Sequence, residues 1–287
     1  MEEYLKSLEV LWSKIESIDF ELPIELEKQI RTFIDAKFLI PEISFKRVYP
    51  SFERLTVNKR LPNNNNKRID KIRHLYNPPS KYIRNYGRAN LKNQSIFYAT
   101  FLTPTAIDEL KPEEGDLITI SKWSILNREE SLHVFPIFLP ENVDSCKKLT
   151  GIVEQTKAIE LSLQYDELLK NYSNEEGKVI LALQKFISNC FSKRISSETN
   201  NQYVVTASLA NKLLYKMFDG TLEAITYPSV QDSTGIDNIA LKPSVLSQKY
   251  ALTKVTEFLV LKNSIDIKAL PIHGVSNKFI GGKIIWE

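Results

Sequence analysis

The chain has 287 residues, of which 43% are hydrophobic and 25% are charged, and its formal net charge is +3. These proportions are those of an ordinary globular protein and exclude wholesale disorder. No apolar stretch approaches the ~20 residues of a membrane-spanning helix, and the acidic N-terminus, MEEYLKSLEV, argues against a secretory signal. We therefore expect a cytoplasmic protein without a membrane partner, with a length typical of about two domains.

The composition excludes a thiol-disulfide or zinc-finger protein, and the standard dinucleotide and P-loop fingerprints are missing. The two cysteines, Cys146 and Cys190, and the three histidines, His74, His133 and His273, show no metal-ligand spacing. Only nine glycines are present, and neither the dinucleotide fingerprint nor the P-loop pattern occurs. We expect no metal site.

The N-terminal 40 residues predict a helical extension. Apolar residues recur at helical spacing over 3–19, and a second helix is predicted after Pro23. This extension over 1–40 either packs on the main body or binds a partner, and the sequence leaves both open.

The central part of the chain predicts strands on both sides of a helical middle. Residues 43–49 and 95–101 have strand patterns, and 61–68 form an asparagine-rich loop that we expect to be exposed and mobile. Thr103 and Pro104 are typical of a helix start, with Thr103 as the N-cap. Ser173 and Glu176 form a capping-box pattern. Further strands are predicted over 117–123, 133–138, 222–227, 239–241, 254–262 and 283–286, and further helices over 154–170 and 202–218.

This order of elements favours an α+β fold over regular β-α-β alternation. We expect a domain over 41–287 that carries a helical insertion at about 150–218.

Positive charge is concentrated in one segment. Residues 46–92 contain thirteen Lys or Arg and two acidic residues, a local net charge of +11, whereas the rest of the chain is net acidic. Such asymmetry indicates either an anionic partner or a solvated basic face.

Three residues suited to dinucleotide chemistry follow one another at short spacing. Arg88 lies in a glycine-containing loop, Tyr98 on the next strand and Glu109 on the helix after it. An arginine fork suits a pyrophosphate, an aromatic ring suits a flat heterocycle, and a carboxylate can support a sugar cation.

These residues also carry a resemblance to a known family. The loop Gly87-Arg88-Ala89-Asn90 is followed by Phe97-Tyr98-Ala99 and then by Thr105-Ala106 with Glu109. Downstream, DGTLEAITYPSV (219–230) precedes Asn238-Ile239-Ala240-Leu241, and Phe45-Lys46-Arg47 fits an earlier arginine. In this order the motifs resemble the RES family over roughly 43–127 and 215–245.

The resemblance implies an ADP-ribosyltransferase-like α+β fold, with a mixed sheet core and inserted helices. It also implies an NAD-consuming enzyme, typically the toxin of a toxin–antitoxin pair, that cleaves the nicotinamide–ribose bond by phosphorolysis or hydrolysis. NAD would be the substrate, inorganic phosphate is one alternative attacking group, and no metal is needed. The usual partner would be a small helical DNA-binding antitoxin, so that nucleic acid is contacted only indirectly.

The resemblance also implies site residues. Arg47 and Arg88 would hold the pyrophosphate, with Arg54 as a rival for Arg47 and with Tyr49 beside the first arginine. Tyr98 would line the nicotinamide–ribose pocket, and Glu109 would stabilise the oxocarbenium-like transition state. Ser229 would place the nicotinamide or the nucleophile, and Asn238 is a supporting candidate.

Two alternatives stay open at this stage. A protein ADP-ribosyltransferase would use the same site with a protein as acceptor. A nucleic-acid-binding protein would use the basic segment, with bases stacking on Tyr76, Tyr82 and Tyr86 between Lys81, Arg84 and Arg88. The sequence leaves a homo-oligomer open.

Overall fold

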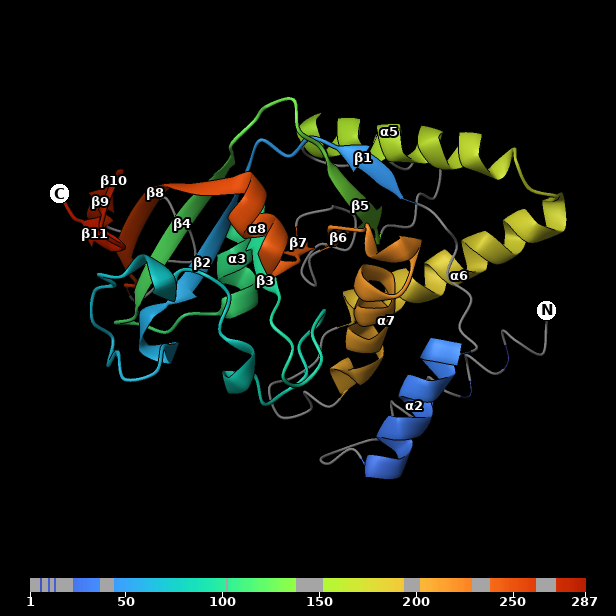
Figure 1. The fold of residues 1–287 in the computed structure, drawn as a ribbon, viewed down its shortest axis with the longest axis horizontal. Coiled ribbons are helices and arrows are strands. Elements are labelled where there is room, and N and C mark those ends of the chain that lie inside the picture. Colours follow the sequence, from blue (N-terminus) through green and yellow to red (C-terminus); the bar gives the residue numbers. More distant parts are fainter. Residues whose placement is uncertain are drawn as a thin grey trace. The chain divides into compact units, whose positions relative to one another are not determined.

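The computed structural model groups the described residues into two compact units that are interleaved in the sequence (Figure 1). The structure describes Lys6, Val10, Ser13 and residues 23–36, 44–101, 103–137, 152–193, 202–228, 238–261 and 272–287. Unit 1 comprises residues 1–45, 80–94 and 133–236, and unit 2 comprises residues 46–79, 95–132 and 237–287. The N-terminal segment is thus grouped with the helical middle of the chain.

Unit 1 is built mainly from helices: α2 (Ile24–Ala36), α5 (Ile152–Leu169), α6 (Asn174–Ser192) and α7 (Val204–Tyr215). Helix α7 is buried along most of its length and packs against α2. Lys212 of α7 donates to the carbonyl oxygens of Ile34 and Asp35, at 2.8 and 3.1 Å, and so satisfies the last turn of α2.

Helix α6 begins with the capping box that its sequence predicts. The Ser173 hydroxyl accepts a hydrogen bond from the Glu176 amide, and the Glu176 carboxylate accepts one from the Ser173 amide. Strands β5 (Leu132–Pro136) and β6 (Ala224–Tyr227) pair in parallel, and Gln184 of α6 donates to the Pro136 carbonyl at 2.9 Å. The capping box and this buried contact fix α6 beside the strands.

Unit 2 is built on a sheet in the order β7-β3-β2-β4-β8-β9, in which the pairs with a described register are antiparallel. Figure 1 shows β2, β4 and β8 running side by side. The strands are β2 (Ser51–Val57), β3 (Phe97–Thr100), β4 (Leu117–Ile125), β7 (Asn238–Leu241), β8 (Tyr250–Leu259) and β9 (Ile272–Ser276). Helices α3 (Thr103–Leu110) and α8 (Pro243–Lys249) and the hairpin β10 (Lys278–Ile280) and β11 (Lys283–Ile285) complete the unit, and β1 (Phe45–Arg47) lies at the sequence boundary between the units.

The register of this sheet separates two faces. Residues directly opposite each other on paired strands point to the same side, and neighbours along a strand point to opposite sides. On one face, Leu55 and Val57 pack with Ala106, Ile107 and Leu110 of α3. On the other face, an aromatic cluster is formed by Phe52, Phe97, Trp123 and Tyr250. We call these the α3 face and the aromatic face.

The prediction of an α+β fold is confirmed by this mixture of helices and strands. Most predicted elements occur, within a few residues of their expected bounds. Of the predicted helix over 3–19, only Lys6, Val10 and Ser13 are described, and these three are helical. The sequence prediction missed β2, which lies inside the sheet, and it missed α8, β9 and β10.

Among the described residues, no helix is both long enough and apolar enough to span a membrane.

Candidate functional site

A hydrogen bond joins two of the predicted site residues. Asn238, at the start of β7, donates from Nδ2 to Oε1 of Glu109 on α3 at 2.7 Å. Asn238 is only 3% exposed, whereas Glu109 is exposed to solvent. A buried amide therefore holds one oxygen of an accessible carboxylate in a fixed place.

Tyr98 lies on the same face of the sheet as this pair. Tyr98 and Thr100 of β3 lie opposite Ala240 and Asn238 of β7, respectively. Because opposite residues share a face, the Tyr98 side chain points to the α3 face and is partly exposed there. The structure thus brings Tyr98, Glu109 and Asn238 to one side of unit 2.

A second carboxylate lies in the same row across the sheet. Glu53 of β2 is opposite Thr100 of β3, which is opposite Asn238 of β7. The Thr103 hydroxyl, at the first turn of α3, donates to the Glu53 carboxylate. Thr103 is the first residue of α3, and its hydroxyl thus connects the helix to β2. Its predicted N-cap role stays a prediction.

Arg54, the rival for the first site arginine, lies on the aromatic face. Its guanidinium lies 5.1 Å from the centre of the Phe97 ring, and NH1 donates to the Tyr98 carbonyl at 3.3 Å. Burial lowers the pKa of Arg54 to about 10, so the side chain keeps its charge at neutral pH. The strand alternation therefore places Arg54 and Glu109 on opposite faces of the sheet. The role of Arg47 as the first site arginine stays a prediction.

Arg47 is the last residue of β1, and Tyr49 follows two positions later. Arg47 is half-buried, and Tyr49 is buried with its ring stacked on Phe101 at 5.1 Å. The Tyr49 carbonyl accepts a hydrogen bond from the Tyr250 hydroxyl at 3.0 Å. Tyr49 thus has a packing role in unit 2, and its prediction as a binding residue stays a prediction.

Arg88 belongs to unit 1 and lies at the C-terminal end of α6. Its NH1 donates to the carbonyl oxygen of Phe191, and it lies 3.5 Å from that of Lys193. The guanidinium also lies 5.3 Å from the centre of the Tyr203 ring. A cation at this end of a helix is favoured by the helix dipole. Binding of a pyrophosphate by Arg88 would have to share or replace these contacts.

Ser229, the remaining predicted site residue, lies outside the described residues.

Many of the basic side chains of segment 46–92 form ion pairs or hydrogen bonds within the protein. Lys59 pairs with Asp116 at 2.8 Å, Lys92 pairs with Glu27 at 3.3 Å, and Arg60 donates to the Leu110 carbonyl at 2.8 Å. Arg54, Arg68 and Arg88 are also engaged by protein groups. Lys59, Arg68 and Lys92 are paired with carboxylates from outside the segment, and these pairs reduce the net positive charge that an external partner would meet.

The three tyrosines of this segment that were predicted to stack on bases differ in exposure. Tyr86 is 4% exposed and donates its hydroxyl proton to Glu27. Tyr76 packs edge-on against Trp123, with the ring centres 4.8 Å apart. Tyr82 is exposed, with Lys81 over its ring. Because stacking on bases needs accessible ring faces, the burial of Tyr86 removes one of the three predicted rings, whereas Tyr76 and Tyr82 are exposed.

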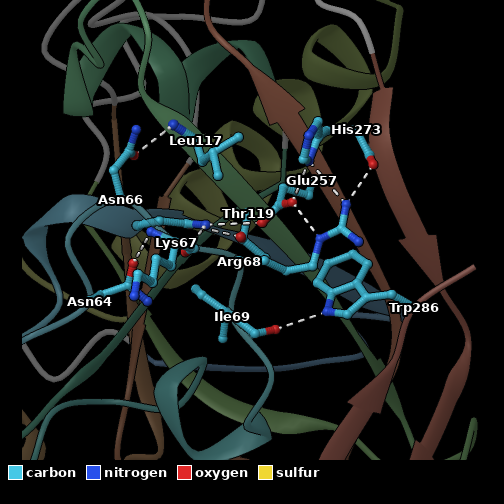
Figure 2. A network of polar contacts seen from close by, with 11 residues as sticks. Asn64, Asn66, Lys67, Arg68, Ile69, Leu117, Thr119, Glu257, His273 and Trp286 are labelled. Carbon is cyan, nitrogen blue, oxygen red and sulfur yellow. Dashed lines mark hydrogen bonds and ion pairs between the residues drawn. The ribbon is translucent and has the colours of Figure 1, made fainter.

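A polar network that the sequence analysis missed occupies the aromatic face (Figure 2). The fully buried Glu257 carboxylate accepts hydrogen bonds from Arg68 Nε at 2.9 Å and from Asn58 Nδ2 at 3.0 Å, and His273 Nδ1 lies 2.8 Å from it. The Asn58 amide oxygen in turn accepts a bond from the buried Thr119 hydroxyl. Each polar partner of Glu257 is thus supplied by the protein, as a buried charge requires.

This network anchors the chain around the asparagine-rich loop. Arg68 NH2 donates to the His273 carbonyl at 2.6 Å, and its guanidinium lies 4.9 Å from the centre of the Trp286 ring. The Asn66 side chain bonds to Gly115 and Leu117, so the loop predicted to be mobile is tied to β4. No local signal reveals these partners, since Asn58 and Glu257 are 199 positions apart in the sequence. The network fits a structural role.

No group of three or more His, Cys, Asp or Glu side chains in the described part of the chain could hold a metal ion. The carboxylate–amide pair on the α3 face suits a different task, the electrostatic support of positive charge that develops beside Glu109.

No protein-family model matches the sequence, and no curated protein matches it significantly. The resemblance to the RES family therefore rests on the motifs alone.

Proposed function

We propose that the protein cleaves the nicotinamide–ribose bond of NAD⁺ with Glu109 as the carboxylate that stabilises the ribosyl cation. The observation that carries the proposal is the hydrogen bond from the buried Asn238 amide to the exposed Glu109 carboxylate. Tyr98 on the same face supports it, as does the order of the motifs that resemble the RES family. We include in the proposal the family's ADP-ribosyltransferase-like fold.

Cleavage of the nicotinamide–ribose bond requires the protein mainly to bind NAD⁺ and to stabilise the developing positive charge. When the bond between ribose C1 and the nicotinamide nitrogen breaks, its electron pair goes to the nitrogen, and the leaving group becomes neutral. Positive charge then develops on the ribose, where a fixed carboxylate stabilises it more than it stabilises the ground state. An oxygen of water or phosphate forms the new bond to C1, and in hydrolysis the proton of the water passes to solvent.

The remaining roles follow the resemblance. We propose that Arg47 and Arg88 bind the pyrophosphate, that Tyr98 contacts the nicotinamide ribose, and that Ser229 helps to place the nicotinamide or the nucleophile. We also propose that the protein acts in the cytoplasm as the toxin of a toxin–antitoxin pair, with a small helical antitoxin.

The direct test is incubation of purified protein with NAD⁺, with and without inorganic phosphate, followed by mass spectrometry of the products. Free nicotinamide with ADP-ribose indicates hydrolysis, and nicotinamide with ADP-ribose 1″-phosphate indicates phosphorolysis. Release of nicotinamide only when a protein acceptor is added, with mass gained by the acceptor, would favour ADP-ribosylation. Intact NAD⁺ under all three conditions would reject the proposal.

Glu109→Gln separates catalysis from binding. The amide is close in size to the carboxylate but carries no negative charge, so turnover should fall by on the order of 10²-fold while NAD⁺ still binds. Glu113→Gln is the matched control, because Glu113 is an exposed glutamate just beyond α3 whose partner is Lys59. Near-normal turnover of Glu109→Gln would remove Glu109 from the site.

A further inference from the structure

Helix α3, which carries Glu109, is too short to hold its own position. It has eight residues, and isolated helices of that length are marginal in water. It ends at Leu110, and the next residue, Lys111, has a φ of 43°, in the left-handed region that residues other than glycine rarely adopt. The place of Glu109 must therefore be set by contacts between α3 and the rest of unit 2.

The apolar contacts of α3 fix its distance from the sheet. Ala106, Ile107 and Leu110 pack on Leu55, Val57 and neighbouring residues of the α3 face. Apolar packing of this kind is non-directional. This packing keeps α3 against β2 but constrains the position of the helix along the helix axis only weakly.

Charged groups of opposite sign hold the two ends of α3. At the N-terminus, the Glu53 carboxylate accepts a hydrogen bond from the Thr103 hydroxyl. At the C-terminus, Arg60 NH2 donates to the carbonyl oxygens of Leu110 and Lys111 at 2.8 and 3.4 Å. A negative charge at the first turn and a positive charge at the last are the arrangement that the helix dipole favours.

Both charged groups come from one continuous piece of chain. Glu53 lies on β2, and Arg60 ends the 3₁₀ turn Asn58–Arg60 that follows it. Strand β2 pairs with β3 and β4 and is therefore fixed on both edges. Glu53 also lies in the row that runs through Thr100 to Asn238, the partner of Glu109. The charge-assisted hydrogen bonds of Glu53 and Arg60 are directional and set the position of α3 along its axis.

We propose that Glu53 and Arg60 are positioning residues. By hydrogen bonding to the two ends of α3, they keep the Glu109 carboxylate within hydrogen-bonding distance of the Asn238 amide. The inference rests on the proposed function, since the position of Glu109 matters for the cleavage of NAD⁺. Neither residue needs to touch the substrate.

The test compares Glu53→Ala, Arg60→Ala and Thr103→Val with Lys278→Ala and Glu129→Ala. Both control residues are exposed, and neither side chain forms a hydrogen bond or an ion pair with a described residue. Each positioning variant should lower kcat by roughly tenfold to a hundredfold, since a small displacement of a reacting group is costly. KM for NAD⁺ should stay within about twofold of the unmutated value, because a group that acts only in the transition state lowers kcat without changing KM. Arg60→Lys, which keeps the charge, should restore part of kcat.

A double-mutant cycle sharpens the test. Glu53→Ala and Thr103→Val remove the same contact, so their effects on kcat should be non-additive. Glu53→Ala and Arg60→Ala act at opposite ends of α3, so their effects on kcat should be closer to additive. Hydrogen exchange gives a readout without turnover. The amides of α3 should exchange faster in each positioning variant and at the normal rate in the controls.

The outcomes distinguish failure of the positioning inference from failure of the proposed NAD⁺ cleavage. Normal kcat in the positioning variants of a protein that consumes NAD⁺ overturns the inference alone, even if α3 exchanges faster. An equal rise of exchange throughout unit 2, with kcat and KM both changed, also overturns it, because the residues then serve the fold generally. Absence of NAD⁺ turnover in the unmutated protein overturns the proposed function and this inference with it.

Discussion

A single glycine makes room for the guanidinium at the edge of the Glu257 network. A Cβ atom at Gly274 would lie 2.9 Å from NH2 of Arg68 and 3.1 Å from Cε3 of Trp286. Both distances are shorter than ordinary contacts, and Arg68 is held in place by Glu257 and by the indole ring. The residue at 274 therefore has to be small because a charged side chain passes over it.

Gly274→Ala should lower the free energy of unfolding by about 1–3 kcal/mol, because the added methyl group forces Arg68 or Trp286 aside. Chemical denaturation monitored by tryptophan fluorescence measures the change. Gly177→Ala is the matched control. The nearest atom to its new Cβ would be 3.7 Å away, and alanine within helix α6 should stabilise by about 0.5–1 kcal/mol. Equal effects of the two substitutions would contradict this account.

At the scale of elements, Arg88 closes the end of α6. Its contacts with Phe191, Lys193 and Tyr203 satisfy the end of a long helix of unit 1. The proposed binding of pyrophosphate asks the same guanidinium to contact a substrate. A guanidinium has five N–H groups, so one side chain has enough donors for both tasks.

Arg88→Ala should weaken NAD⁺ binding by roughly 1.5–3 kcal/mol, the value expected for a lost charge-assisted contact. Calorimetry in a Glu109→Gln background measures affinity without turnover. Tyr203→Ala is the control, because it removes the ring beneath Arg88 and leaves the guanidinium. If the two variants lose stability equally but neither loses affinity, Arg88 serves only helix α6.

At the scale of the whole molecule, the charge distribution bears on substrate capture. Segment 46–92 has a local net charge of +11, although at least six of its basic residues are engaged by protein groups. The pyrophosphate of NAD⁺ carries two negative charges. We therefore expect long-range attraction to assist binding but to be weaker than the sequence charge alone suggests.

Raising the salt concentration from about 50 to about 200 mM should lower kcat/KM by several-fold and leave kcat unchanged, because salt screens the attraction between exposed charges. Steady-state kinetics at constant pH measures this. A value of kcat/KM that does not respond to salt would show that the basic segment does not attract the substrate.

The sequence by itself determined the elements whose signals are local. The periodicity of Ile30 and Ile34 predicted α2, and Ser173 with Glu176 predicted the start of α6, because helix contacts and caps connect residues three or four positions apart. The motif order also placed Glu109 and Asn238 among the site candidates, and the structure joins these two. The chemical roles of the predicted site residues stay predictions: Arg47, Tyr49, Arg88, Tyr98, Glu109, Ser229 and Asn238.

The tertiary structure alone decided which residues face each other. Strand β2 has charged residues in its middle and no clear apolar alternation, yet it lies inside the sheet because β3 and β4, later in the chain, pair with its two edges. That pairing sends Glu53 to the α3 face and Arg54 to the aromatic face. The pairing of β4 with β8 brings Glu257 to Asn58, which is 199 positions away in the sequence. Strand pairing and burial are contacts between distant segments, so a local pattern cannot specify their partners.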